Sequence, residues 1–144
     1  MPDIKPTIQD SAKQLDGPLV LVIEDNLSDS NILERHLHQL GYRVEVVRDG
    51  ERGLIRAHET VPIAIILDLE LPGINGDRVI TFINADERLR PVPVIVSSVH
   101  VEVGEQMMRK GASDFLAKPI DRSALKAMLV ECHAEYKSSA TSVT

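Results

Sequence analysis

Short apolar runs alternate with amphipathic stretches along the central part of the chain. Residues 19–23 and 63–67 are continuous runs of Leu, Val, Ile and Ala, as expected for strands that are covered on both faces. Residues 43–48 alternate more nearly between apolar and polar side chains, which favours a strand near the edge of a sheet. The whole pattern predicts five strands, at residues 19–23, 43–48, 63–67, 92–98 and 114–117.

A helix is predicted after each of these strands. Residues 28–42 place five side chains on one helical face, those of Ile32, Leu33, His36, Leu37 and Leu40. Gly41 suits the left-handed position after the end of that helix. The other helices are predicted at residues 49–59, around residues 79–83, at residues 101–111 and at residues 122–136. This alternation implies right-handed crossovers and an α/β fold, a doubly wound parallel sheet with helices on both faces.

Length and composition fit one domain that does not cross a membrane. The chain has 144 residues, and we expect a domain at residues 18–137 between flexible polar tails at residues 1–17 and 138–144. No apolar run approaches the roughly 20 residues needed to cross a bilayer. The N-terminus also lacks the features of a secretion signal, so we expect a cytoplasmic protein.

Charge and cysteine content exclude several function classes. The formal net charge is −6 and no Lys- or Arg-rich cluster occurs, which argues against binding to nucleic acid. Cys132 is the single cysteine of the chain, so an internal disulfide framework and a cysteine-rich zinc site are both excluded.

Polar residues stand at the carboxyl ends of four predicted strands: Glu24 and Asp25 after the first, Asp68 after the third, Ser97 and Ser98 at the end of the fourth, and Lys118 before Pro119 after the fifth. In a doubly wound parallel sheet, ligands bind in the crevice at these strand ends. We therefore expect these side chains to line one crevice.

Asp68 ends an apolar run, so its ionisable side chain needs a chemical explanation. Three carboxylates in one crevice repel one another, and a cation removes that conflict. Mg²⁺ fits best because it takes oxygen ligands, whereas no His and Cys residues are grouped as zinc prefers. Lys118 and a serine hydroxyl can contact incoming phosphoryl oxygens. A carboxylate beside Mg²⁺ can attack phosphorus, so we interpret Asp68 as a phosphoacceptor.

Four segments, in this order and with these separations, carry a family resemblance: "VLVIEDN", "LDLELPGINGDRVI", "PVIVSS" and "GASDFLAKPI". Over residues 18–134 the chain resembles the receiver domain of two-component response regulators, of the stand-alone chemotaxis-regulator type. The resemblance implies a flavodoxin-like fold, with five strands in the order 2-1-3-4-5 and five helices. It also implies Mg²⁺-dependent transfer of a phosphoryl group from a phosphohistidine.

The resemblance assigns the metal ligands residue by residue. Glu24 and Asp25 match the acidic pair, Asp68 matches the phosphoacceptor, and the backbone carbonyl of Glu70 matches the third protein ligand of Mg²⁺. The side chain of Glu70 is long and acidic at a position above the crevice. We expect it to alter the lifetime of the aspartyl phosphate.

The resemblance also assigns the residues that respond to phosphorylation. Lys118 matches the phosphate-contacting lysine, and its bond to Pro119 is expected to be cis, as only about 5% of X-Pro bonds are. The switch hydroxyl falls on Ser98 if positions are counted forward from the acceptor, or on Ser97 if a small residue should follow it. Phe115 matches the rotating aromatic residue but lacks the hydroxyl of the more usual tyrosine.

The partners implied by the resemblance are proteins. A sensor histidine kinase or a histidine phosphotransfer domain donates the phosphoryl group. The surface of residues 101–111, 114–117 and 122–136 then changes and signals to an output protein that the sequence does not identify, or forms a homodimer. We expect no membrane or nucleic-acid partner and no independent turnover of a small-molecule substrate.

Two other interpretations stay open. A pseudo-receiver would keep the fold and bind a partner without being phosphorylated. A phosphatase of the haloacid-dehalogenase type would use the Asp-Leu-Glu at residues 68–70, although that motif belongs on the first core strand of such enzymes. Taken singly, Asp68 could cap a turn, Lys118 could be a surface residue, and Phe115 could be core packing.

Overall fold

The computed structural model describes residues 17–143, and side chains up to residue 133. Within this range the chain forms five strands, β1 Leu19–Ile23, β2 Arg43–Val47, β3 Ala64–Asp68, β4 Val94–Ser98 and β5 Asp114–Ala117. The helices that follow them are α2 Leu27–Gln39, α3 Gly50–Thr60, α4 Gly76–Ala85, α5 Val101–Arg109 and α6 Arg122–Val143. Apart from Gly17, the predicted N-terminal tail lies outside the described residues.

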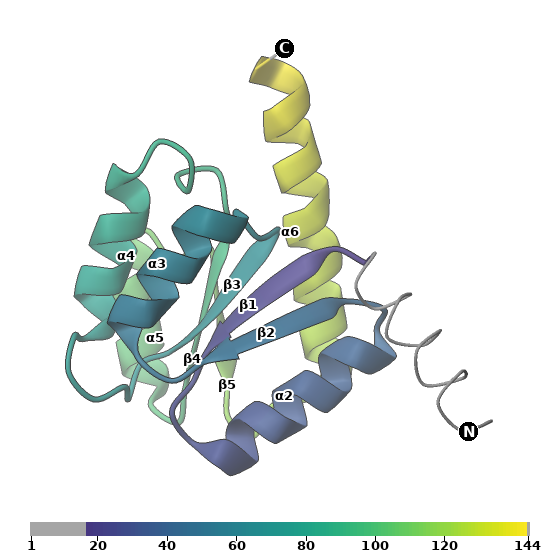
Figure 1. Ribbon diagram of the computed structural model, residues 1–144. Coiled ribbons are helices and arrows are strands. Elements are labelled where there is room, and N and C mark those ends of the chain that lie inside the picture. Colours follow the sequence, from purple (N-terminus) through teal and green to yellow (C-terminus); the bar gives the residue numbers. More distant parts are fainter. Residues whose placement is uncertain (1–16, 144) are drawn as a thin grey trace, which may run out of the picture.

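The five strands form one parallel sheet in the order β2-β1-β3-β4-β5 (Figure 1). Val22 of β1 is in register with Ile66 of β3, which in turn is in register with Ile95 of β4. Helices α3, α4 and α5 lie on one face of this sheet, and α2 and α6 lie on the other. The predicted α/β fold and strand order are confirmed.

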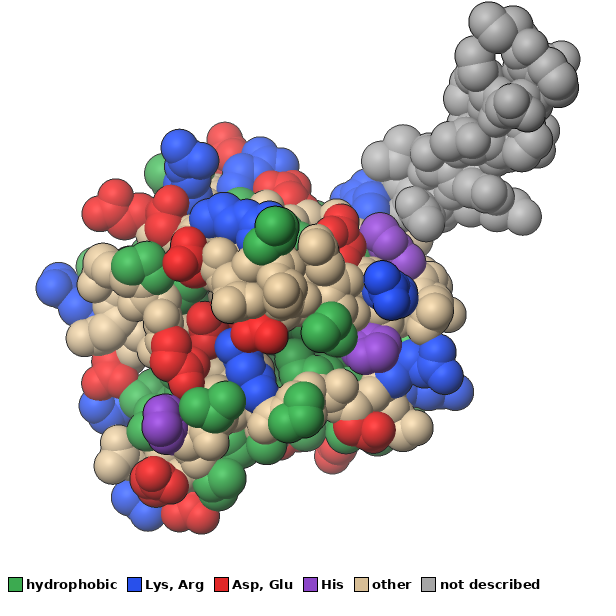
Figure 2. Space-filling view, turned by 90° about the horizontal axis from the view of Figure 1, so that it is seen from below, with side chains coloured by type: hydrophobic (Ala, Val, Ile, Leu, Met, Phe, Trp, Pro, Cys, Tyr) green, Lys and Arg blue, Asp and Glu red, His purple; other side chains and the backbone are tan. Residues whose placement is uncertain are grey.

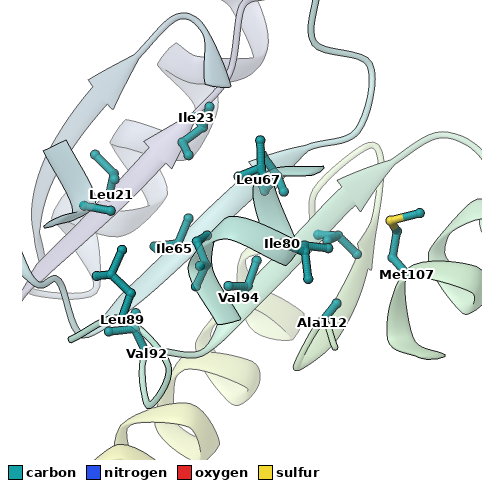
Figure 3. Close-up of a cluster of buried hydrophobic side chains, with 14 of the residues drawn as sticks. Leu21, Ile23, Ile65, Leu67, Ile80, Leu89, Val92, Val94, Met107 and Ala112 are labelled. Carbon is teal, nitrogen blue, oxygen red and sulfur yellow. The ribbon is translucent and has the colours of Figure 1, made fainter. Parts of the chain in front are cut away.

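Both faces of the central strands are buried, because successive side chains of a strand point to opposite faces. One core lies beneath α3, α4 and α5 and contains Leu21, Ile65 and Leu67 (Figure 3). The other core packs Val20, Val22 and Ile66 against side chains of α2 and α6, namely Leu33, Leu37, Leu125 and Leu129. Double coverage explains why these strands are continuous apolar runs, whereas the edge strand β2 is only half-buried.

The helical face predicted for α2 is partly wrong. Leu33 and Leu37 are buried as expected, but Ile32 is 45% exposed. Residues 32 and 33 differ by about 100° around a helix, and the stripe that contacts the sheet is too narrow to include both. Ile32 instead lines a shallow surface hollow together with Pro119 and Ile120.

Helix α6 continues to Val143 instead of ending near Tyr136. Residues 137–143 contain neither Gly nor Pro, so no residue of that segment is a strong helix terminator. Neither this helix nor any other within residues 17–143 is long and apolar enough to cross a membrane.

Side-chain caps end the connections that follow β1, β2 and β3. Asn26 ends the connection after β1, and its side chain accepts a hydrogen bond from the Asp29 N–H in the first turn of α2. Asp49 caps α3 after β2 and Asn75 caps α4 after β3 in the same way. Three residues separate β1 from α2 and two separate β2 from α3, whereas seven residues, 69–75, separate β3 from α4.

Candidate functional site

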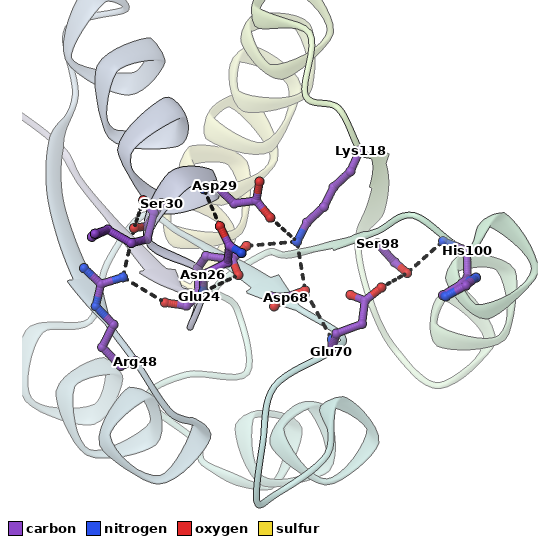
Figure 4. Close-up of polar contacts among 11 residues, drawn as sticks. Glu24, Asn26, Asp29, Ser30, Arg48, Asp68, Glu70, Ser98, His100 and Lys118 are labelled. Carbon is purple, nitrogen blue, oxygen red and sulfur yellow. Dashed lines mark hydrogen bonds and ion pairs between the residues drawn. The ribbon is translucent and has the colours of Figure 1, made fainter.

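The carboxyl ends of β1, β3 and β5 bring together Glu24, Asp68 and Lys118 (Figure 4). Asp68 is the last residue of β3 and is 4% exposed, while Glu24 directly follows β1 and is 1% exposed. Lys118 follows β5, and the peptide bond between Lys118 and Pro119 is cis. The structure therefore joins three of the predicted site residues in one buried cluster.

The ammonium group of Lys118 is the centre of this cluster. Lys118 Nζ lies 3.1 Å from Glu24 Oε1, 3.2 Å from Asp68 Oδ1 and 3.0 Å from Asp29 Oδ2. Asp29 comes from the first turn of α2, and sequence reasoning did not select it. Its position one helical turn after the acidic pair was the available signal, but an acid there is commonly explained by the helix dipole alone.

Burial and neighbouring charges shift the pKa values of Asp68 and Lys118 in this cluster. Burial raises the pKa of Asp68, and contact with Glu24 raises it further, although hydrogen bonds with Glu70 act in the opposite direction. Burial alone would lower the pKa of Lys118, but the hydrogen bond to Asp29 and the charges of Asp68 and Glu24 outweigh it, so the pKa of Lys118 is raised. One ammonium group serves three carboxylates, and additional positive charge would be favourable.

The donor set suits a hard divalent cation. Glu24 Oε1 is buried and has no hydrogen-bond partner among the described residues, although it forms an ion pair with Lys118. Asp25, next in the chain, is exposed at the same strand end. Within residues 17–133, no three His, Cys, Asp or Glu side chains already form a metal cluster. Mg²⁺ takes oxygen ligands, commonly one or two carboxylates, and completes its coordination with other oxygens and water.

Glu70 connects the acceptor to the end of β4. Its backbone N–H donates to Asp68 Oδ1 at 3.2 Å, and its Oε1 accepts a hydrogen bond of 3.0 Å from the hydroxyl of Ser98. The same hydroxyl accepts a hydrogen bond from the backbone N–H of His100 at 2.9 Å. Glu70 thus links the two residues, since its backbone contacts Asp68 and its side chain contacts Ser98 (Figure 4).

Ser97 has a different environment from that of Ser98. It is fully buried, and its hydroxyl has no hydrogen-bond partner among the described residues. Ser97 is the register partner of Asp68, and its carbonyl accepts the backbone N–H of Leu69. The two serines that the sequence left unresolved are therefore distinct, because the hydroxyl of Ser98 alone contacts another residue of the site, Glu70.

Phe115 lies against helix α5. The ring is half-buried and packs against the core beneath α3, α4 and α5. A Cβ atom added to Gly104 of α5 would lie 2.3 Å from Phe115 Cδ1, a separation that no ordinary contact allows. The absence of a side chain at Gly104 creates the space in which this ring lies.

Seen from the carboxyl ends of the strands, acidic and basic side chains adjoin near the middle of the molecular face (Figure 2). Exposed apolar residues follow the strand ends here, Leu27 after β1 and Val99 and Val101 after β4.

The hollow beside Lys118 has a volume of only about 100 Å³. A groove of about 820 Å³ lies elsewhere, between α3 and α4, and contains none of the charged cluster. The charged cluster therefore adjoins only a small hollow, on its Lys118 and Asp29 side.

Comparison with known proteins places this geometry among signalling domains. Residues 20–130 match the family model described as response regulator receiver domain. FilR2 of Methanothrix harundinacea (strain 6Ac), named as a probable methanogenesis regulatory protein, is 32% identical over 125 residues, which cover 78% of this chain and 79% of FilR2. The transcriptional regulatory protein PrrA of Mycobacterium leprae (strain TN) is 34% identical over 128 residues. That match covers 88% of this chain but only 54% of PrrA.

The fold also matches solved structures. The receiver domain of the sensor histidine kinase PA1611 from Pseudomonas aeruginosa PAO1 is 32% identical, with a TM-score of 0.77, and the match covers 82% of this chain and 98% of that one. Its crystal structure has a magnesium ion coordinated in the active site cleft. A structure of NtrX from Brucella abortus has a TM-score of 0.80, and the match covers 88% of this chain but only 29% of NtrX.

Proposed function

This chain belongs to the family of response regulator receiver domains, and we propose that it accepts a phosphoryl group from a phosphohistidine onto Asp68. The observation that supports this most strongly is the buried pair of Asp68 and Lys118, whose charged groups lie 3.2 Å apart at the end of β3. The donor is a sensor histidine kinase or a histidine phosphotransfer domain.

Asp68 is the nucleophile of the transfer. One of its carboxylate oxygens forms a bond to phosphorus while the P–N bond of the phosphohistidine breaks, and the electron pair of that bond leaves with the imidazole. Glu24, Asp25, Asp68 and the carbonyl of Glu70 are the proposed ligands of Mg²⁺. When bound, the ion supplies positive charge that offsets the carboxylates and stabilises the phosphoryl oxygens.

Lys118 and Ser98 then stabilise the new phosphoryl group. The ammonium of Lys118 is already beside Asp68 and can donate to a phosphoryl oxygen after a small movement. The hydroxyl of Ser98 donates to Glu70 in the structure, so it must leave Glu70 before it can donate to phosphate. We therefore assign the switch role to Ser98 and not to Ser97.

The output is a change of surface. Movement of Ser98 toward the phosphoryl group leaves space near β4 into which Phe115 turns, and this alters the surface of α5, β5 and α6. Phosphorylation shifts the balance between two conformations only by its differential interaction with them. A partner protein, or a second copy of the chain, binds that altered surface. The chain spans about half the length of PrrA.

One observation favours a second candidate function, that of an interaction module that is not phosphorylated. The side chain of Glu70 accepts the hydrogen bond of the Ser98 hydroxyl and adds negative charge above the acceptor Asp68. If that contact is permanent, it would oppose an incoming phosphoryl group. A small-molecule phosphatase finds less support, because the hollow beside Lys118 is too small to enclose an organic phosphate.

Intact mass spectrometry separates these candidates. The wild type and Asp68→Asn are incubated with Mg²⁺ and acetyl phosphate, with a third sample that contains a chelator. We expect the wild type to gain one phosphoryl group, and both the variant and the chelated sample to gain none. A folded wild type that gains no phosphoryl group would favour the unphosphorylated interaction module.

A further inference from the structure

Asp29 is a fourth acidic residue at the site, and its contact with Lys118 does more than stabilise a helix. An acid in the first turn of a helix is favourable by itself, and Glu51 and Asp77 occupy first turns of α3 and α4. Asp29 differs because its carboxylate also lies 3.0 Å from Lys118 Nζ. Its backbone N–H is held by Asn26, which fixes the turn that presents the carboxylate.

The ammonium of Lys118 is surrounded by carboxylates: it donates hydrogen bonds to Asp29 and Asp68 and forms an ion pair with Glu24. A lysine ammonium has three N–H groups, and three carboxylate oxygens lie within 3.2 Å of Lys118 Nζ. A phosphoryl oxygen that binds this ammonium therefore competes with these carboxylates for it.

Exposure indicates which carboxylate is displaced. The side chain of Asp29 is 36% exposed, whereas those of Glu24 and Asp68 are 1% and 5% exposed. A carboxylate near solvent exchanges its partner for water at little cost, while a buried one does not. Asp29 is thus the contact that Lys118 loses most easily.

We propose that Asp29 is a positioning residue that competes with the phosphoryl group for the Lys118 ammonium and so slows phosphorylation of Asp68. In the unphosphorylated protein Asp29 retains Lys118 at the α2 side of the crevice. During transfer the ammonium turns from Asp29 to a phosphoryl oxygen. This inference rests on the proposed function, since it requires that Asp68 is the acceptor.

Asp29→Asn tests the competition, because it removes the charge and keeps the side-chain size. With Mg²⁺ and acetyl phosphate, we expect the rate of phosphoryl gain to rise about twofold to fivefold, the range for a half-exposed ion pair. Asp29→Ala, which removes the acceptor altogether, should give at least the same increase. Glu102→Gln is the matched control, because it removes an acid from the first turn of α5 at the same edge of the sheet. Its rate should equal that of the wild type.

A simple charge effect on the anionic donor would also speed the reaction, so the test includes a double-mutant cycle. In a Lys118→Met background, Asp29→Asn should leave the rate unchanged, because no ammonium remains to be released. An equal increase in that background would overturn the proposal. NMR of the Lys118 Nζ–H group gives a second readout, in which hydrogen exchange with water should be faster in Asp29→Asn than in the wild type.

The two hypotheses fail in different ways. A wild type that gains no phosphoryl group contradicts the proposed function itself. A phosphorylated wild type whose rate is unchanged or reduced by Asp29→Asn contradicts only the role of Asp29. Unchanged hydrogen exchange at Lys118 in the variant would likewise show that Asp29 does not hold the ammonium in solution.

Discussion

The hydroxyl of Ser98 donates a hydrogen bond of 3.0 Å to Glu70 Oε1, so one carboxylate side chain bridges the ends of β3 and β4 beside Asp68. The proposed switch hydroxyl is therefore already engaged in the unphosphorylated protein. Glu70 is exposed, so this bond can open toward solvent at modest cost.

Glu70→Ala should accelerate phosphorylation of Asp68 by acetyl phosphate. The change frees the hydroxyl of Ser98 and removes a negative charge near the anionic donor, and together we expect an effect of about threefold to tenfold. Glu70→Gln is the matched control, because the amide oxygen can still accept from Ser98 while the charge is gone. A rate in Glu70→Gln equal to that of Glu70→Ala would assign the effect to charge. Rates that match the wild type in both variants would refute a role for Glu70.

Gly104→Ala should destabilise the protein even though Ala favours a helix. The intrinsic gain is about 1 kcal/mol, but the new methyl group would overlap the ring of Phe115, and overpacking costs about 1–3 kcal/mol. Urea denaturation should show a net loss of up to about 2 kcal/mol. In a Phe115→Ala background the same change should be neutral or stabilising. A loss of equal size in that background would show that Phe115 is not the residue that excludes a side chain at Gly104.

Asp68→Asn should stabilise the metal-free protein at neutral pH. Because burial and Glu24 raise the pKa of Asp68, the folded protein binds its proton more tightly than the unfolded chain does. The stability of the wild type therefore falls as pH rises from the ordinary value of 3.8 through the raised pKa. The advantage of Asp68→Asn should appear above that range and disappear below it.

Addition of Mg²⁺ should reverse this order of stability. A ligand that binds only the folded state stabilises it according to its concentration and affinity, so the melting temperature of the wild type should rise with Mg²⁺. That of Asp68→Asn should rise much less, since one anionic ligand is lost. Equal shifts in both proteins would indicate that Asp68 does not contribute to metal binding.

The sequence predicted the sheet and most of the charged cluster because both depend on local patterns. Apolar runs identified the buried strands, and the carboxyl ends of parallel strands necessarily meet at one edge, so Glu24, Asp68 and Lys118 could be placed together. Asp29 could not be found in this way, because its contact depends on the angle at which α2 leaves the strand end. The exposure of Ile32 was likewise set by packing that periodicity does not specify.

The two serines illustrate the same limit. Ser97 and Ser98 are neighbours of the same type, and strand alternation requires them to point to opposite faces, but it does not say which one meets a partner. The side chain of Glu70 distinguishes them, and its direction depends on the connection after β3. The contacts of a long side chain in a loop are the part of the site that is hardest to predict from the sequence alone.

The most direct test of the account is to locate the phosphoryl group. After reaction with acetyl phosphate and Mg²⁺, sodium borohydride reduces an aspartyl phosphate to homoserine, and peptide mapping by mass spectrometry identifies the converted position. We predict homoserine at position 68 in the wild type, dependent on both Mg²⁺ and acetyl phosphate. Conversion at another carboxylate, or none in a folded protein, would contradict the assignment of Asp68 as the phosphoacceptor.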